Sequence, residues 1–152
     1  MAEALKILPE AAEVVSAEAR AILTMVQDED RRGRLADLIA AVEDGEVAGD
    51  DAQALEEVLE LGLQSGRLRA VYGPEGEQAA LTLYRRLPRG RELGKAAREV
   101  SAALGALEGR PLEKVSVQAL GPGAHVVTVA AEGLELAIRL DRQGARLTTV
   151  GI

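Results

Sequence analysis

The segment from Leu134 to Asp141 limits the possible folds most narrowly. Its apolar side chains alternate with charged ones, with Leu134, Leu136, Ile138 and Leu140 on one side and Glu135, Arg139 and Asp141 on the other. This alternation is typical of a strand with one buried face. The flanking turns, Glu132-Gly133 and Asp141-Arg-Gln-Gly144, are short, and strands joined by short turns pair antiparallel. The sequence therefore predicts an antiparallel sheet in the C-terminal part of the chain.

Three more strand-like runs complete this sheet, at residues 114–119, 125–131 and 145–152. A helical stripe precedes them, formed by Leu93, Ala96, Ala97, Val100, Leu104 and Leu107 and ended by Gly109 and Pro111. We expect a four-stranded antiparallel meander with the helix 92–108 packed across its apolar face. This architecture is similar to helix-plus-meander α+β folds, including cystatin-like ones, but no inhibitor or catalytic motif accompanies it.

The N-terminal part is helical in its spacing. Residues 4–28 carry an a/d seam of about three heptads, with Pro9 best placed in the first turn of the main helix. The seam consists of Leu5, Leu8, Ala12, Val15, Ala19, Ile22 and Val26. It fits either a self-associating coiled coil or a helix that packs on its own core. Residues 28–34 are expected to be a loop, and a second helix follows and ends near Gly45.

A third helix is predicted from Asp50, which can cap it, with Gln53 at the position of a capping box. Ser65-Gly66 ends this helix, and residues 67–86 are expected to form a β-hairpin that turns between Gly73 and Gly76. The likeliest boundary is the linker near Gly90. The fold class is α+β, with a helical domain at residues 1–88 that ends in a hairpin and a helix-plus-sheet domain at 91–152.

The composition restricts the chemistry. There is no cysteine, which excludes disulfides and thiolate sites, and no Phe or Trp, so the core must be aliphatic. Asn is absent and Arg far outnumbers Lys, which fits either heat adaptation or a GC-rich genome. Charges interrupt the N-terminal segment throughout, so we expect no signal peptide or membrane span and a cytoplasmic protein.

Residues of the central unit, LEEVLELGLQSGRLRAVYGPEGEQAALTLYRR, resemble the third helix and wing of winged-helix domains. The resemblance covers about residues 30–88 and rests on the order of the elements. It implies nucleic-acid binding through the third helix. That helix, however, carries Asp51, Glu56, Glu57 and Glu60 and no base, and phosphates would repel it. The acidic helix favours the use of such domains as protein–protein modules.

Charge is unevenly distributed along the chain. The net charge is −7, yet residues 1–66 hold 16 acids and 5 bases, whereas residues 67–98 hold 8 bases and 3 acids. The candidate binding residues in this basic band are Arg67, Arg69, Arg85, Arg86, Arg89 and Arg91. Guanidinium groups suit phosphates or the carboxylates of an acidic partner. The alternative is a solvated surface, or pairing with the acidic first half of the chain.

No catalytic frame, cofactor motif or metal site stands out. His125 is the only histidine, with Ser116 and Thr128 as possible neighbours on adjacent strands, and a structural role is the better interpretation. The acidic stretches 28–30 and 43–51 could hold a hard cation, but the EF-hand pattern fails at Ala48 and Leu55. The glycines lack the frame of a phosphate loop.

These features favour a non-enzymatic interaction or regulatory module that self-associates, as a homodimer, and binds an unidentified protein partner. The final strand, which runs to Ile152 with no charge after Arg146, could pair with another copy if it is an edge. The first alternative is a winged-helix-type nucleic-acid regulator that uses the arginine-rich wing. The second is a small enzyme that uses His125.

Overall fold

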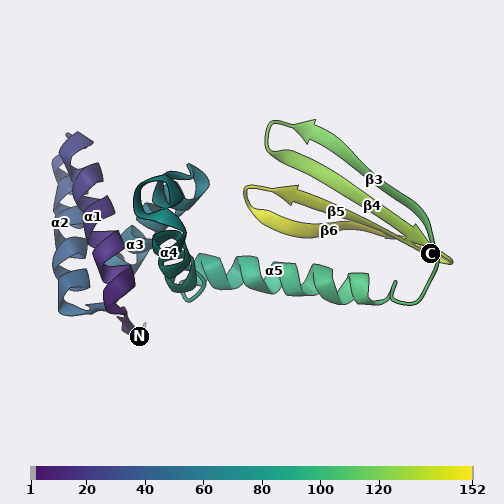
Figure 1. Ribbon diagram of the computed structural model, residues 1–152, viewed down its shortest axis with the longest axis horizontal. Coiled ribbons are helices and arrows are strands. Elements are labelled where there is room, and N and C mark those ends of the chain that lie inside the picture. Colours follow the sequence, from purple (N-terminus) through teal and green to yellow (C-terminus); the bar gives the residue numbers. More distant parts are fainter. Residues whose placement is uncertain (1–2, 152) are drawn as a thin grey trace. The chain divides into compact units, whose positions relative to one another are not determined.

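The computed structural model describes residues 3–151. Its internal contacts divide the chain into two compact units, Met1–Arg89 and Gly90–Ile152, each described here by itself. The fold class is α+β, as predicted: helices dominate the first unit, and an antiparallel sheet dominates the second (Figure 1).

The first unit is a bundle of four helices with one small ladder. Its elements are β1 (Leu5–Lys6), α1 (Pro9–Met25), α2 (Glu29–Asp44), β2 (Glu46–Val47), α3 (Asp50–Gln64) and α4 (Arg67–Tyr84). Helix α1 packs against α2, α3 and α4, and Figure 1 shows α1 and α2 side by side. The helix α5 (Pro88–Gly105) starts at the end of this unit and continues into the second.

Helix α1 is a core helix of its own unit. Pro9 occupies the first turn, as expected, where its missing N–H costs nothing. Val15 and Ala19 are fully buried and Ile22 is 7% exposed. The part of the apolar stripe from Val15 to Ile22 is therefore occupied inside the bundle, whereas Leu5 and Leu8 precede the helix and Leu8 is exposed.

The loop predicted at residues 28–34 is wrong, because α2 already begins at Glu29. Asp28 caps the helix, and its carboxylate accepts a hydrogen bond of 3.1 Å from the Arg31 N–H. Gly45 ends α2 in the left-handed conformation. The expected cap of α3 is also wrong: the cap residue is Gly49, and Asp50 lies inside the first turn.

A two-residue ladder ties the start of the chain to the α2–α3 connection. Leu5 pairs with Val47 and Lys6 with Glu46 in antiparallel register. Val47 is 1% exposed, so the connection that the sequence marked only as acidic contributes an apolar side chain to the core.

The hairpin predicted for residues 67–86 is wrong, because residues 67–84 form α4. The segment contains only two β-branched residues, Val71 and Thr82, so its strand propensity is low. Gly73-Pro74, interpreted as a turn, is a kink within the helix, with Gly73 at φ 75° and ψ −179°. A residue before proline avoids the helical region, and glycine tolerates the positive φ. The segment assigned to a wing is thus helical.

The buried side chains of α4 confirm its helical period. Leu68, Ala80, Leu83 and Tyr84 are buried, and the last three have the spacing of one helix face. With the buried Leu38, Leu55 and Leu59 from the other helices they make the core of this unit mainly aliphatic. Burial of each leucine contributes about 1.5–3 kcal/mol relative to exposure, so leucine packing takes the place of the phenylalanine and tryptophan that the chain lacks.

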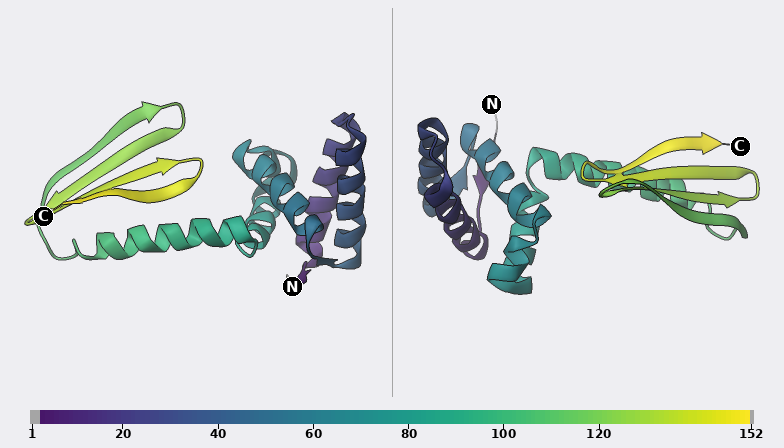
Figure 2. Two further views of the ribbon diagram at one scale, coloured as in Figure 1. Left: turned by 180° about the vertical axis from the view of Figure 1, so that it is seen from behind. Right: turned by 90° about the horizontal axis from the view of Figure 1, so that it is seen from above.

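The second unit contains the predicted four-stranded meander. The strands are β3 (Leu112–Gly121), β4 (Ala124–Ala131), β5 (Leu134–Asp141) and β6 (Gly144–Gly151), in the spatial order β3-β4-β5-β6 (Figures 1 and 2). Every neighbouring pair is antiparallel. The turn into β6 is held by Asp141, which accepts hydrogen bonds from the Gln143 N–H and from the guanidinium groups of Arg139 and Arg146.

One face of this sheet is apolar. Strand register aligns Val115, Val129 and Leu136 in one row across the sheet, and Val117, Val127 and Ile138 in the next. The residues between them, such as Ser116 and Thr128, lie on the other face because side chains alternate along a strand.

Helix α5 covers part of the apolar face. It begins at Pro88, so the PRGRE segment predicted as a linker is its first turn. Ala103 and Leu104 near its end, and Leu107 just beyond, pack with Ala131 and Leu136 in the core of this unit. No helix among the described residues has the length and apolar character needed to cross a membrane.

Candidate functional site

A buried carboxylate lies at the centre of the first unit. Glu18 of α1 is 2% exposed. The Arg67 Nε donates to its Oε1 at 2.6 Å, and the Tyr72 hydroxyl donates to its Oε2 at 2.9 Å. Both donors come from α4, so the cluster fastens the first half of α4 to α1. A buried charge with both oxygens satisfied is tolerated, whereas one that lost its cation would destabilise the fold.

A second cluster repeats this chemistry at the end of the unit. Glu60 of α3 accepts from the Tyr84 hydroxyl at 2.8 Å and pairs with the Arg89 Nε at 2.6 Å. The backbone N–H of Arg89 donates to the buried Glu56. The acidic helix α3 therefore uses two of its carboxylates inside the protein, where they bind α4 and the start of α5.

These bonds change the ionisation of both tyrosines in the chain. Burial and then the hydrogen bond to Glu18 raise the pKa of Tyr72 to about 12. Burial and then the hydrogen bond to Glu60 raise the pKa of Tyr84 to about 12. Both phenols stay protonated as hydrogen-bond donors, which suits a structural role and not that of a general base at neutral pH.

The basic band is not one open surface. Arg67 and Arg89 are paired as described, Arg69 pairs with Glu77 at 3.2 Å, and Arg86 donates to the carbonyl of Lys6. The side chains of Arg85 and Arg91 form no ion pair or hydrogen bond with another described residue. Pairing with the acidic first half, the alternative considered for these arginines, thus applies to two of the six, Arg67 and Arg89.

Sequence reasoning missed Glu18, although a signal was present. Glu18 follows Val15 by three positions and precedes Ile22 by four, so it lies within the apolar stripe of α1. An acid in a buried stripe requires a partner. The two tyrosines of the chain were candidates to supply it.

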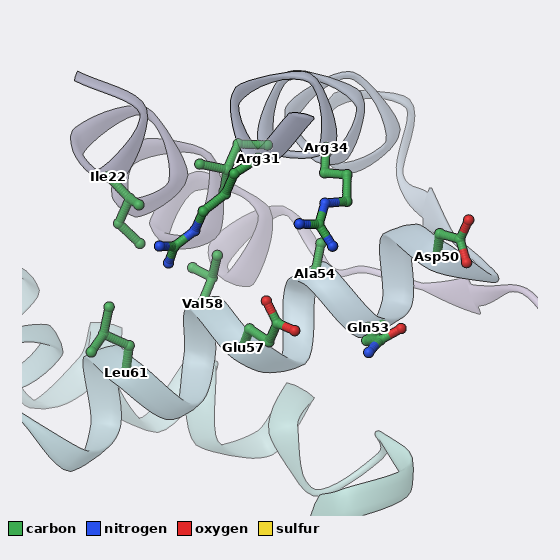
Figure 3. A pocket seen from close by; sticks show the side chains of 10 residues that line it. Ile22, Arg31, Arg34, Asp50, Gln53, Ala54, Glu57, Val58 and Leu61 are labelled. Atoms are coloured by element: carbon green, nitrogen blue, oxygen red, sulfur yellow. The ribbon is translucent and has the colours of Figure 1, made fainter. Parts of the chain in front are cut away.

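A cleft of about 210 Å³ lies between α2 and α3 (Figure 3). Arg31 and Arg34 extend over it from α2, and Glu57 faces them from α3 (Figure 3). Ile22, Leu35, Val58 and Leu61 form its apolar wall. Asp50 also lines the cleft, so the two cations are matched by two carboxylates and the cleft has no net preference for an anion.

His125 has no catalytic partner among the described residues. It lies on β4 opposite Ala119 and Leu140 and is exposed. Ser116 and Thr128 pair with each other on the opposite face of the sheet, because their positions differ from His125 by an odd number. Between residues 3 and 151, no group of three or more His, Asp or Glu side chains is arranged to hold a metal ion.

The β3 side of the second unit leaves apolar surface uncovered. Val115 is 60% exposed and Val117 is 66% exposed, whereas Leu136 and Ile138 in the same rows are buried. Figure 1 shows the reason: β3 is the strand farthest from α5. We call Val115, Val117 and Val127 the apolar strip.

Both outer strands of the sheet are free along one edge within the described unit. Strand β3 pairs in regular register from Lys114 to Ala119, with irregularities only near its ends. Strand β6 has a register shift near Thr148, which disrupts its edge for pairing. The edge of β3 is therefore the more regular template for another strand.

No protein-family model, curated protein or solved structure matches this chain. The winged-helix and cystatin-like resemblances thus stay predictions, and a function has to be argued from the residues themselves.

Proposed function

We propose that the protein is a non-enzymatic interaction module that self-associates through β3. The observation that carries the proposal is the coincidence of a free, regular strand edge with the apolar strip beside it. Unprotected edges of this kind pair with other chains unless charge, proline or a bulge prevents it.

The sequence of β3 is compatible with pairing to its own copy. Residues 115–120 carry no charge, and the only charged residues of the strand, Glu113 and Lys114, lie at one end. In an antiparallel pair related by a twofold axis, these ends point away from each other, so like charges do not meet. An axis at Ser116 sets Val115 opposite Val117 of the copy, which joins the two apolar strips.

The first test is the mass of the protein in solution, by light scattering coupled to gel filtration. We expect a dimer for the unmodified chain and a monomer for Val115→Lys/Val117→Lys, which places charge on the strip without touching the buried core. The matched control is Thr149→Lys/Val150→Lys on β6, which adds the same charge at the other edge and should remain dimeric. A dimer lost only in the control would contradict the assignment to β3.

Cysteine cross-linking gives the register, because the chain has no cysteine of its own. Under mild oxidation, Ser116→Cys should form a disulfide-linked dimer, since an axis at Ser116 sets this position directly opposite its own copy, and such residues have Cβ atoms about 4.5–5.5 Å apart. Val117→Cys faces Val115 of the copy and should cross-link much less. Thr128→Cys, on the interior strand β4, should stay monomeric on a reducing-agent-free gel. Equal cross-linking at all three positions would mean random collision.

The same measurement with a short DNA duplex tests the nucleic-acid alternative. Six to ten phosphate contacts would make binding fall by orders of magnitude as salt rises. We expect no mass shift at low or high salt, because most of the candidate arginines are engaged within the protein.

A further inference from the structure

The first unit contains a groove that the self-association proposal does not use. It lies between α1 and the second half of α4 and has a volume of about 570 Å³. Two stripes at helical spacing form its sides: positions 10, 11, 13, 14 and 17 on α1, and positions 72, 75, 76, 79 and 82 on α4. A groove bordered by two helices is the shape that accepts a third helix.

The floor of the groove is built from small or aliphatic residues, namely Ala11, Val14, Ala17, Gly76 and Ala79. Small side chains allow a helix backbone to approach closely. Leu8, which is 64% exposed, stands at the entrance and adds apolar surface. The small floor residues therefore leave room for larger aliphatic side chains of a helix that binds in the groove.

The rim of the groove is acidic. Glu10, Glu13 and Glu75 line it, and no lysine or arginine among the described residues does. None of these three carboxylates forms an ion pair with a described residue. Positive charges on an incoming segment would find free partners on both helices.

The groove is held in shape before anything binds. Tyr72 lines one end, and its hydroxyl is fixed by the buried Glu18. A Cβ at Gly76 would collide with the Cβ of Tyr72, four residues earlier in α4, but would meet Val14 of α1 at an ordinary contact distance of 3.5 Å, so the glycine is needed for the path of α4 at this end of the groove. A preformed groove costs little ordering entropy on binding.

We infer that this groove binds a basic amphipathic helix of another protein, with aliphatic residues on the floor and Lys or Arg at the rim. A second copy of this chain is a poor occupant. Among the described helices only α5 has a basic excess, and of its apolar residues Val100 is already buried and Leu104 packs on the core of its own unit. The inference is independent of the strand pairing proposed above.

The test uses the full chain and two labelled synthetic helices of about 18 residues, or five turns, that share one leucine stripe. One carries Lys at the remaining positions and the other carries Glu. Fluorescence anisotropy should show saturable binding of the Lys peptide and none of the Glu peptide. Binding of both peptides, or of neither, would overturn the inference.

Two variants with matched controls locate the site. The variant Glu10→Lys/Glu13→Lys/Glu75→Lys should lower the affinity for the Lys peptide by about tenfold or more. The control Asp37→Lys/Asp44→Lys/Glu46→Lys has the same net charge and should keep the affinity of the parent chain. Ala79→Phe fills the groove without changing charge and should also weaken binding, unlike Ala40→Phe on the exposed face of α2. Equal losses in both charge variants would show non-specific attraction and refute the groove. Dissociation of the self-associated protein by the groove variants alone would identify the occupant as a second copy, contrary to the inference.

Discussion

At the scale of single residues, paired carboxylates connect the helices of the first unit, and the composition alone does not reveal these pairs. Glu18 and Glu60 each accept a hydrogen bond from a tyrosine and an ion pair from an arginine. The sequence left open whether the arginines of the basic band pair with the acidic first half, and Arg67 and Arg89 do so. Arg85 and Arg91 are the members of the candidate set that remain available, and Glu10, Glu13 and Glu75 are the acids that line an apolar groove.

The two tyrosines predict how stability depends on alkaline pH. Their pKa is about 12 in the folded protein and about 10 when unfolded, so the unfolded state loses protons first. Their contribution is complete below about pH 10 and is lost as the pH rises towards 12. Denaturant unfolding followed by circular dichroism should show that the free energy of unfolding falls over this pH range. The fall should be much smaller in Tyr72→Phe/Tyr84→Phe. If the free energy of unfolding falls with pH equally in the double variant, other groups cause the pH dependence.

At the scale of elements, two glycines differ in the backbone conformation that they adopt. Gly66 precedes α4 and has a φ of 74°. This left-handed conformation lets α4 follow α3 directly, without a long linker. Gly33 lies inside α2 with open space where a Cβ would be. The same substitution should therefore act in opposite directions at the two sites.

Gly33→Ala should stabilise the protein by about 0.5–1 kcal/mol, because alanine loses less conformational freedom in a helix. Gly66→Ala should destabilise it by about 1–2 kcal/mol, because an L-residue is strained at positive φ. Urea unfolding of the two variants beside the parent chain measures both. Destabilisation by Gly33→Ala, or no effect of Gly66→Ala, would contradict the conformations described here.

The elements that were predicted correctly had a strong period and clear ends. Alternation and glycine turns revealed the meander, and the stripe from Val15 to Ile22 revealed α1. The hairpin failed because Leu68, Ala70 and Tyr72 alternate by chance over a few residues, and a short run of this kind is ambiguous between strand and helix. Gly73-Pro74 was a real break in the helix but only a kink. The need of Glu18 for a partner could have been predicted from its place in the stripe, but the groove and the pairing of Glu18 with Arg67 could not, since both need residues about 50 or more positions apart to meet.

At the scale of the whole molecule, the chain has two hydrophobic cores. One lies among α1–α4, and the other contains Leu107, Ala131 and Leu136. The division falls between Arg89 and Gly90, within the first turn of α5. Arg89 belongs to the first unit because its backbone and side chain bind Glu56 and Glu60.

Two overlapping fragments test whether each core is sufficient. Residues 1–94 keep Arg89 and should fold alone with a helical circular dichroism spectrum. Residues 88–152 keep all of α5 and should give a spectrum with a strong strand contribution. In both cases thermal unfolding should be cooperative, because each fragment retains its own buried cluster. A fragment without a cooperative transition would show that its core depends on the rest of the chain.

The placement of the tyrosines also decides what an optical experiment on this protein can observe. The chain has no tryptophan or phenylalanine, and both tyrosines belong to the first unit. Near-ultraviolet absorbance and intrinsic fluorescence therefore come from the helical unit alone, while the sheet carries no aromatic chromophore except the weak far-ultraviolet absorber His125. A single tryptophan placed on β3 would add a signal from the second unit that no native residue obscures.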